Sequence, residues 1–286
     1  MNLIPELNFY IKTFSVNKQF NIILLNILFN KRNIFIINKT ILEHLEKEID
    51  KANLEYFRAF IKEIYDETRY LKEDSLTVKN YKSDVLNFYL NSNINFIIPI
   101  KSNINSEFKR EEFNNLLDLT DLEDQNYNSL LSSILCKGLI SYNYSDFNNN
   151  SNIDDLFKNL FKIPNKIDLV YCFNRDYSHR FLEMLANKRM FYYSLVSRDF
   201  PRNIHEYNEK KKELRKKLGN RLDIYVTKKR TLIHERKIFI NGLSITFDNA
   251  FDNILIEEPT WEITIEYSEE KFNTWIKKRT SFNKLN

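Results

Sequence analysis

The residues best suited to chemistry are His234 and Arg236, in the stretch IHERKIFI at residues 233–240. This stretch is predicted to be a β-strand, and residues i and i+2 of a strand project from the same face. His234 would then lie beside Arg236, which places a nucleophile or base next to a fixed cation. Lys237 would project from the opposite face, into solvent. The pair suits work on a phosphate group, and the alternative is an ordinary half-buried strand histidine.

Basic residues concentrate in one segment of the chain. Residues 202–230 contain eleven Lys and Arg against four Asp and Glu. Their net charge of +7 exceeds the +4 of the whole chain, so the remainder is mildly acidic. Such a segment can attract nucleic acid or anionic lipid, although a solvated helix face is the plainer alternative. The residues expected to contact a nucleic-acid backbone are Lys210, Lys211, Arg215, Lys216, Lys228, Lys229 and Arg230.

Other kinds of site are disfavoured. Cys136 and Cys172 lie in apolar surroundings without a Cys/His cluster, which predicts two free buried thiols and no metal site. No Gly-rich phosphate loop or HExxH motif is present, so no cofactor is predicted. The apolar residues 20–29 are too few to span a bilayer and predict a buried helix. The early Glu6 argues against a signal peptide, so a cytoplasmic location is expected.

The pattern of elements predicts an α/β fold with a mixed sheet flanked by helices. The polar run DFNNNSN at residues 146–152 predicts a linker between an α/β region of residues 1–145 and a domain of residues 153–286. In the first region, strands are expected at residues 33–38 and 95–100, and helices at residues 41–51, 54–70, 83–90, 108–117 and 122–136. Thr40 is the expected cap of the first of these helices.

The second region has a more regular order of elements. Strands are expected at residues 166–173, 190–196, 222–227, 234–240, 243–247 and 261–267, and helices at residues 176–188, at residues 204–218 and after Ser268. The first strand, helix and strand form a βαβ unit, which implies a parallel strand pair. Asn241-Gly242 between two strands is a strong signal for a two-residue hairpin.

This order of elements, with LDIYVT at residues 222–227 and LIHERKIFING at residues 232–242, resembles the C-terminal half of phospholipase D-like domains. The resemblance covers roughly residues 166–280 and is to the H-D-R variant branch, which includes the terminal domain of some MIT-domain proteins. It implies a phospholipase D-like domain in which His234 attacks phosphorus and Arg236, in place of the usual lysine, holds the phosphate oxygens. Arginine keeps the charge and adds bidentate geometry.

The chain also departs from the full family motif. Asn241 stands where the motif has an aspartate, and residues 248–253 (DNAFDN) do not reproduce its Gly-Ser-x-Asn element. Enzymes of the superfamily combine two histidine motifs, whereas this chain has one. The resemblance therefore implies a homodimer that brings two His234 residues together.

Three functions remain open at this level. The first is a phosphodiester-directed protein that engages nucleic acid and acts as a metal-independent, dimeric nuclease in a bacterial antiphage or conflict system, a role that rests on analogy. The second is a catalytically degenerate scaffold or sensor that binds a partner protein, a nucleotide or a nucleic acid. The third, less favoured, is peripheral binding to an anionic membrane through the basic segment.

Overall fold

The chain folds as a mixed α/β protein with sheets flanked by helices, as the sequence predicts. The computed structural model describes residues 1–15, 18–94, 97–113, 115–120, 127–143, 146, 155–157, 160, 169–175, 189–195, 208–209, 212–213, 216, 221–240, 242–249 and 262–284. The chain divides into two compact units, each with its own sheet. The first unit contains Met1–Gly138 with Pro164–Lys166, and the second contains Leu139–Ile163 with Ile167–Asn286.

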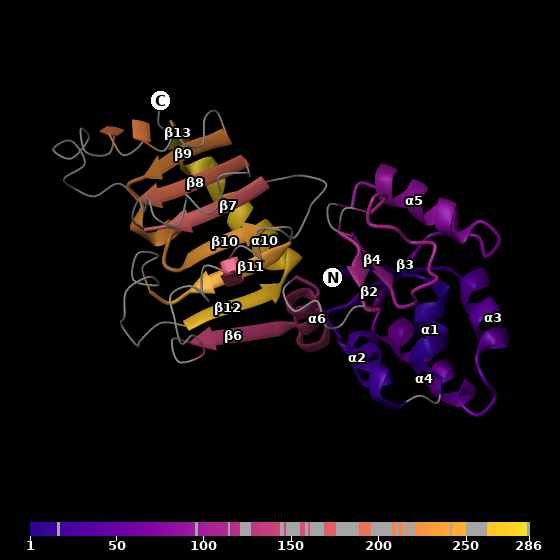
Figure 1. Cartoon of the computed structure of the whole chain (residues 1–286). Helices are drawn as coiled ribbons and strands as arrows, with labels where there is room; N and C mark the ends of the chain where they lie inside the picture. The colour runs from indigo at the N-terminus through magenta and orange to yellow at the C-terminus, as the bar shows by residue number, and fades with distance from the viewer. Residues whose placement is uncertain are drawn as a thin grey trace. The chain divides into compact units, whose positions relative to one another are not determined.

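The first unit contains a parallel sheet in the order β3-β2-β1-β4-β5. Figure 1 labels β2, β3 and β4 of this sheet and the helices of the same unit. The strands of the sheet are β1 (Asn2–Pro5), β2 (Ile34–Ile37), β3 (Tyr70–Lys72), β4 (Ile97–Lys101) and β5 (Leu117–Asp118). The central strands are nearly continuous runs of buried residues, which is typical of parallel strands covered on both faces. β1 lies at the centre, between β2 and β4.

Helices connect these strands. They are α1 (Leu7–Thr13), α2 (Lys18–Phe29), α3 (Lys39–Glu48), α4 (Leu54–Asp66), α5 (Tyr81–Asn91) and α6 (Tyr127–Lys137). The predicted cap of α3 was wrong: Asn38, not Thr40, accepts a hydrogen bond from the backbone N–H of Ile41 at 3.0 Å. The predicted helix at residues 108–117 was also wrong. Its described residues form turns that lead into β5, because Asn115 bonds to the Ile97 carbonyl and accepts from the Tyr89 hydroxyl at 2.7 Å.

The second unit contains a mixed sheet in the order β13-β9-β8-β7-β10-β11-β12-β6. Its strands are β6 (Leu139–Asn143), β7 (Leu169–Asn174), β8 (Arg189–Leu195), β9 (Leu222–Thr227), β10 (Arg236–Ile240), β11 (Leu243–Phe247), β12 (Glu262–Tyr267) and β13 (Asn283–Lys284). β7, β8 and β9 are parallel, as the βαβ pattern predicts, and the other pairs are antiparallel. The predicted helix at residues 176–188 lies outside the described residues.

Two local predictions for the second unit are confirmed. β10 and β11 form the expected hairpin, in which Ile240 pairs with Leu243. Gly242 has a φ of +79°, and a Cβ atom there would lie 2.5 Å from the Tyr267 ring, so the turn requires glycine. The side chain of Ser268 caps α10 (Glu269–Lys277) by accepting from the N–H of Lys271 at 3.2 Å. The sequence-based boundary assigned residues 139–143 to the first region, but β6 pairs with β12 in the second sheet.

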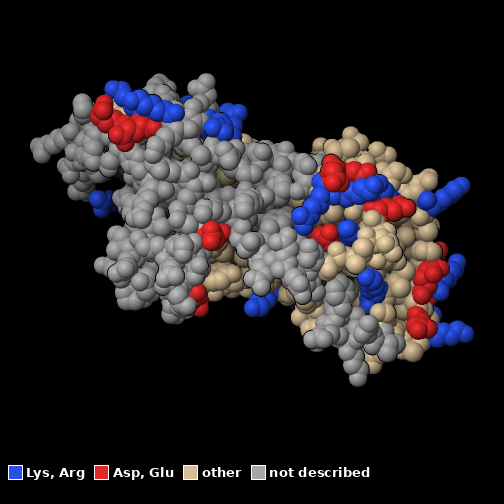
Figure 2. All heavy atoms as spheres, in the orientation of Figure 1, with Lys and Arg blue, Asp and Glu red and all other residues tan. Residues whose placement is uncertain are grey.

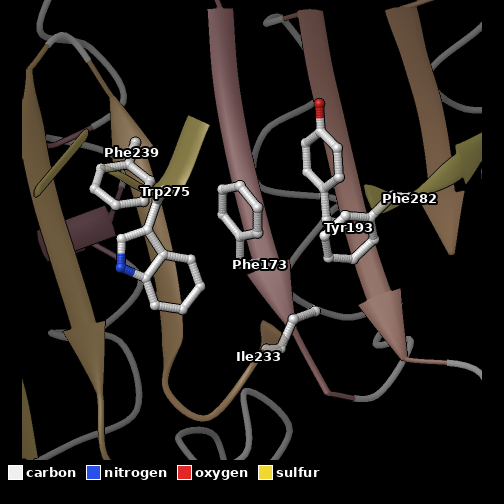
Figure 3. Packing of buried hydrophobic residues seen from close by; sticks show 6 residues of the cluster. All are labelled: Phe173, Tyr193, Ile233, Phe239, Trp275 and Phe282. Carbon is white, nitrogen blue, oxygen red and sulfur yellow. The ribbon is translucent and has the colours of Figure 1, made fainter. Parts of the chain in front are cut away.

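An aromatic core lies between one face of this sheet and α10. Phe173 is at its centre: its ring stacks on Tyr193 with centroids 4.7 Å apart and meets Trp275 edge-to-face at 5.0 Å (Figure 3). Phe239 and Phe282 complete the aromatic group. Ile233, fully buried, lies at one end of the cluster. This core fixes the chain directly before His234 and Arg236, the residues that the sequence marks as best suited to chemistry.

Both cysteines are free, and they differ in burial. Cys172 is fully buried on β7, where burial raises the pKa of its thiol well above the ordinary value. Cys136, on α6, is half-buried rather than buried, which corrects the prediction for that residue. Among the described helices, none combines the length and the apolar run needed to cross a bilayer.

Candidate functional site

His234 and Arg236 do not share a strand. β10 begins at Arg236, and His234 lies in the bend before it, with an exposed side chain. The predicted strand was too long at its start, so the i and i+2 rule cannot place the two side chains together. Arg236 is half-buried, and its Nη1 donates to the carbonyl of Asp248 at 3.4 Å. Both residues therefore lie near the start of β10, but strand geometry does not pair them.

Glu235 and Lys237 are the two residues of this stretch that the structure joins. The prediction that Lys237 is solvated was wrong, because Lys237 is only 4% exposed. Its Nζ lies 2.7 Å from Oε2 of Glu235, donates to Oγ1 of Thr246 at 3.0 Å and lies 5.6 Å from the Trp275 ring centroid. A buried ammonium requires such partners. The hydrogen bond from Lys237, followed by its charge, holds the pKa of the Glu235 carboxyl below its ordinary value.

A second lysine, Lys278 at the C-terminal end of α10, contacts the same region. Nζ of Lys278 lies 3.7 Å from the Trp275 ring centroid and donates to the carbonyl of Leu232 at 3.4 Å. Burial lowers the pKa of Lys278; the charge of Glu235 opposes this lowering, and the charge of Lys237 adds to it. The Trp275 ring thus contacts two cations, a favourable arrangement for an aromatic face.

The segment that carries His234 is held at several points. Ile233 is buried in the aromatic core, and its carbonyl accepts from Nε of Arg175 at 3.4 Å. The Leu232 carbonyl accepts from Lys278, and Arg236 starts the β10 ladder opposite Phe247. The exposed imidazole of His234 is therefore attached to a backbone that is fixed on both sides. A binding or reacting group needs such a fixed position.

This segment lies at the carboxyl edge of the parallel strands β7, β8 and β9. Arg175 directly follows β7, and Lys228 and Lys229 directly follow β9. η3 (Arg230–Leu232) then leads the chain across to His234 and to β10, which is antiparallel to β7 and so starts at the same edge. We call the residues gathered here the basic edge: the cationic Arg175, Lys228, Lys229, Arg230 and Arg236, together with His234. All are exposed except Arg236, which is half-buried.

A buried amide lies beneath the basic edge. Asn174, the last residue of β7, is 1% exposed, and its Nδ2 donates to the Tyr192 hydroxyl at 2.9 Å. Its Oδ1 has no hydrogen-bond partner among the described residues. Lys237 pairs with Phe173 across β10 and β7, so Arg236 and Asn174 are the next residues in register. An unused acceptor deep in a site is a feature that a bound donor or water would satisfy.

The basic helix predicted at residues 204–218 is described only in part. Lys210, Lys211 and Arg215 lie outside the described residues. Lys216 is exposed, and the neighbouring Lys212 forms an exposed ion pair with Glu209 at 3.1 Å. Lys228, Lys229 and Arg230, by contrast, are brought to the basic edge.

Sequence reasoning missed Asn174, Arg175, Lys237 and Lys278. A signal existed for the first two, because polar residues at the end of a parallel strand, or directly after it, converge at the carboxyl edge of the sheet. Nothing in the sequence marked Lys237, whose burial depends on Trp275 from a distant helix. Within the described part of the chain, no three His, Cys, Asp or Glu side chains are grouped as a metal site would require.

Comparisons with known proteins add little to this geometry. No family model and no curated protein matches the chain. Among solved structures, it is similar to TrmBL2, an archaeal chromatin protein with a novel mode of DNA binding. The TM-score is 0.28 and the sequence identity 11%, over 83% of this chain and 79% of that one. A TM-score this low gives no basis for transferring a fold or a function, so the site has to be interpreted from its own residues.

Proposed function

We propose that the second unit engages the phosphodiester backbone of nucleic acid at its basic edge. The observation that carries this proposal is the gathering of Arg175, Lys228, Lys229, Arg230 and Arg236 at one end of three parallel strands. Ligands of open α/β sheets bind outside the carboxyl ends of the strands. Exposed Lys and Arg in this position suit phosphate oxygens, and such contacts fix a backbone without selecting its sequence.

The resemblance to phospholipase D-like domains supports the same ligand chemistry. It assigns the phosphate-facing residues to the segment that contains His234 and Arg236, and this segment lies at the basic edge. Glu235, the acidic residue within the segment, is neutralised by its contact with buried Lys237 at 2.7 Å. Asp248, beside Arg236, is also exposed, but the five Lys and Arg of the basic edge leave its charge mainly positive, which favours an anionic polymer.

Salt-dependent binding tests this proposal. The triple variant Lys228→Ala, Lys229→Ala, Arg230→Ala is compared with the wild type on single- and double-stranded DNA and RNA. Each lost phosphate contact reduces the slope of log affinity against log salt by about 0.7 to 0.9, so we expect the slope to fall by about 2 to 3. The matched control removes three exposed lysines of the first unit, Lys47, Lys51 and Lys62. Equal slopes in both triple variants would contradict the proposal.

A second candidate is cleavage of the bound backbone by His234, as the resemblance implies. It is favoured by the exposed position of an imidazole on a fixed backbone at the basic edge. The imidazole nitrogen would form a bond to phosphorus while the bond from phosphorus to the leaving oxygen breaks. A second His234 in a homodimer would protonate that oxygen, and water would then hydrolyse the phosphohistidine.

A nuclease assay in EDTA distinguishes cleavage from binding alone. We expect wild-type activity to be lost in His234→Ala and retained in the control His44→Ala, which removes a half-buried histidine of the first unit. Active protein that is strictly monomeric in light scattering would contradict the dimeric mechanism. Tight, salt-dependent binding without turnover would instead support the catalytically degenerate scaffold or sensor, with a role beside a partner protein in a bacterial conflict system.

A further inference from the structure

The first unit has the strand order in which a sheet forms a ligand crevice. From β1 the chain proceeds through β2 to β3, which extend the sheet on one side of β1, and β4 then pairs with the other side of β1. The order therefore reverses between β1 and β4. In open parallel sheets, ligands bind at this reversal, outside the carboxyl ends of the strands. A ligand site is therefore expected at the segments that follow β1 and β4.

A cleft of about 540 Å³ lies at that place. Its walls come from three segments: residues 6–8 after β1, residues 78–83 at the start of α5, and residues 105–108 after β4. Ligand sites usually have volumes of roughly 300 to 1,000 Å³. Asn8, Ser83, Asn105 and Ser106 provide polar groups around the cleft. The cleft thus combines a suitable size with hydrogen-bonding walls.

Glu6 is the most constrained polar residue of the cleft. Its side chain is 5% exposed, and its Oε1 accepts from the backbone N–H of Ser102 at 2.5 Å and from the Ser102 hydroxyl at 2.9 Å. Both hydrogen bonds of the Glu6 carboxylate among the described residues are made by Oε1, which leaves Oε2 for other donors. A carboxylate has about four lone-pair sites, so Oε2 can accept from two donors on a ligand. The two bonds from Ser102 hold it in a fixed position.

The residues around Glu6 maintain this environment. The Tyr81 hydroxyl donates to the carbonyl of Pro5 at 2.7 Å, and its ring stacks on Phe108 with an interplanar angle of 9°. Burial raises the pKa of Tyr81, and the charge of Glu6 raises it further. Tyr81 therefore remains a neutral donor to the backbone and leaves the carboxylate of Glu6 for a ligand.

The charges of the cleft select among ligand classes. Its charged residues are Glu6, Lys79, Lys82 and Glu107, two of each sign, and Lys82 also pairs with Glu112 at 2.8 Å. On the face drawn in Figure 2, basic and acidic side chains of this unit likewise lie side by side. The three glycines of the chain are Gly138, Gly219 and Gly242, so none follows β1, where a phosphate-binding loop would need them. Glu6 instead places a negative charge there, which repels phosphate.

We propose that this cleft binds a small uncharged ligand through the vicinal hydroxyls of a sugar, with Glu6 as the central acceptor. The balanced charges favour a neutral ligand over an amine or a phosphate. A fixed, buried carboxylate is the acceptor that hydroxyl donors bond to most strongly. The sugar can belong to a free monosaccharide or to a nucleoside. This site is separate from the basic edge and does not depend on the function proposed for it.

Calorimetric titration of the full chain tests the proposal with adenosine, 2′-deoxyadenosine, D-ribose, ADP and spermidine. We expect adenosine to bind and 2′-deoxyadenosine to bind about tenfold or more weakly, because it lacks one of the vicinal hydroxyls. Glu6→Gln should weaken adenosine binding about ten- to hundredfold, because the open oxygen can become an amide donor. Ribose that binds as well as adenosine identifies a sugar site, and adenosine binding alone identifies a nucleoside site.

Several outcomes would overturn the inference. These are no binding of adenosine or ribose at millimolar concentration, equal affinity for the two adenosines, or tighter binding of ADP or spermidine. If Glu6→Gln lowers the far-UV circular dichroism of the protein, Asn105→Trp replaces it, since Asn105 is exposed on the cleft wall and a bulkier side chain there narrows the site. Adenosine binding unchanged by that variant would also count against the cleft. The basic-edge triple variant should bind adenosine normally, which keeps this test distinct from the nucleic-acid test.

Discussion

In the first unit the edge of the parallel strands carries the fixed carboxylate of Glu6, whereas in the second unit it carries Arg175 and the run Lys228 to Arg230. Both edges lie at the carboxyl ends of parallel strands, where polar side chains and exposed backbone converge. The sheet therefore supplies the location, and the residues that follow each strand supply the chemistry. In our proposals, one edge accepts hydrogen bonds from a neutral ligand and the other binds phosphate.

The two units also bury a cation differently. Arg69 in the first unit donates to the carbonyls of Leu28 and Asn30 at 3.0 and 3.2 Å and pairs with Glu63 at 3.0 Å and Glu67 at 2.8 Å. Lys237 in the second unit has fewer partners, which are Glu235, Thr246 and the Trp275 ring. The guanidinium joins strand and helix ends through several bonds, whereas the ammonium is a single point charge.

The largest expected effect comes from removing the core beneath the basic edge. Phe173→Ala should lower the free energy of unfolding of the second unit by about 3 to 5 kcal/mol, because a large buried ring is lost from the centre of its core. Both tryptophans, Trp261 and Trp275, belong to this unit, so urea denaturation followed by tryptophan fluorescence reports on it selectively.

The same variant tests whether the two edges are independent. Phe173→Ala should release Ile233 from its packing and weaken nucleic-acid binding, while adenosine binding at Glu6 remains as in the wild type. If adenosine binding were lost at the same urea concentration as the tryptophan signal, the comparison between two separate edges would fail.

Removing the two buried cations, Arg69 and Lys237, should lower the free energy of unfolding by different and smaller amounts. Arg69→Met is expected to cost about 2 to 3 kcal/mol, since it removes the partner of the Leu28 carbonyl and of the Glu63 carboxylate. Glu67 keeps its ion pair with Lys31, and the Asn30 carbonyl keeps the N–H of Asn33. Lys237→Met should cost only about 1 kcal/mol, because Glu235 lies mostly in solvent once the pair is broken. Denaturation followed by far-UV circular dichroism and by tryptophan fluorescence measures both. An equal or greater loss in Lys237→Met would show that the number of partners does not decide the cost.

The smallest effect concerns pH. The pKa of Glu235 is depressed in the folded state, chiefly by the hydrogen bond from Lys237. Its contribution to stability is therefore present above the ordinary carboxyl pKa and is lost as pH falls through the folded value. Thermal unfolding followed by tryptophan fluorescence between about pH 6 and pH 3 should show a shallower acid dependence in Glu235→Gln than in the wild type. The exposed Glu270→Gln, in the first turn of α10, is the matched control.

Local sequence signals predicted the structure correctly where neighbouring residues in the sequence set the conformation. Asn241-Gly242 predicted the β10–β11 hairpin, Ser268 predicted the start of α10, and the strand at residues 222–227 was placed without error. Local sequence signals failed where contacts with residues distant in sequence set the local conformation. Asn115 is bonded by Tyr89 and β4, which replaces the expected helix with turns, and the expected strand loses His234 because Ile233 enters the aromatic core.

By itself, the sequence determined the α/β class, the parallel strands of the second unit and the hairpin between β10 and β11. These features depend on hydrophobic period, turn residues and charge, which are properties of short segments. Only the tertiary structure decided that Lys237 is buried, that Lys278 donates to the Leu232 carbonyl and that Glu6 is fixed by Ser102. Each of these depends on contacts between residues distant in sequence, 96 positions apart for Glu6 and Ser102, which no local pattern encodes.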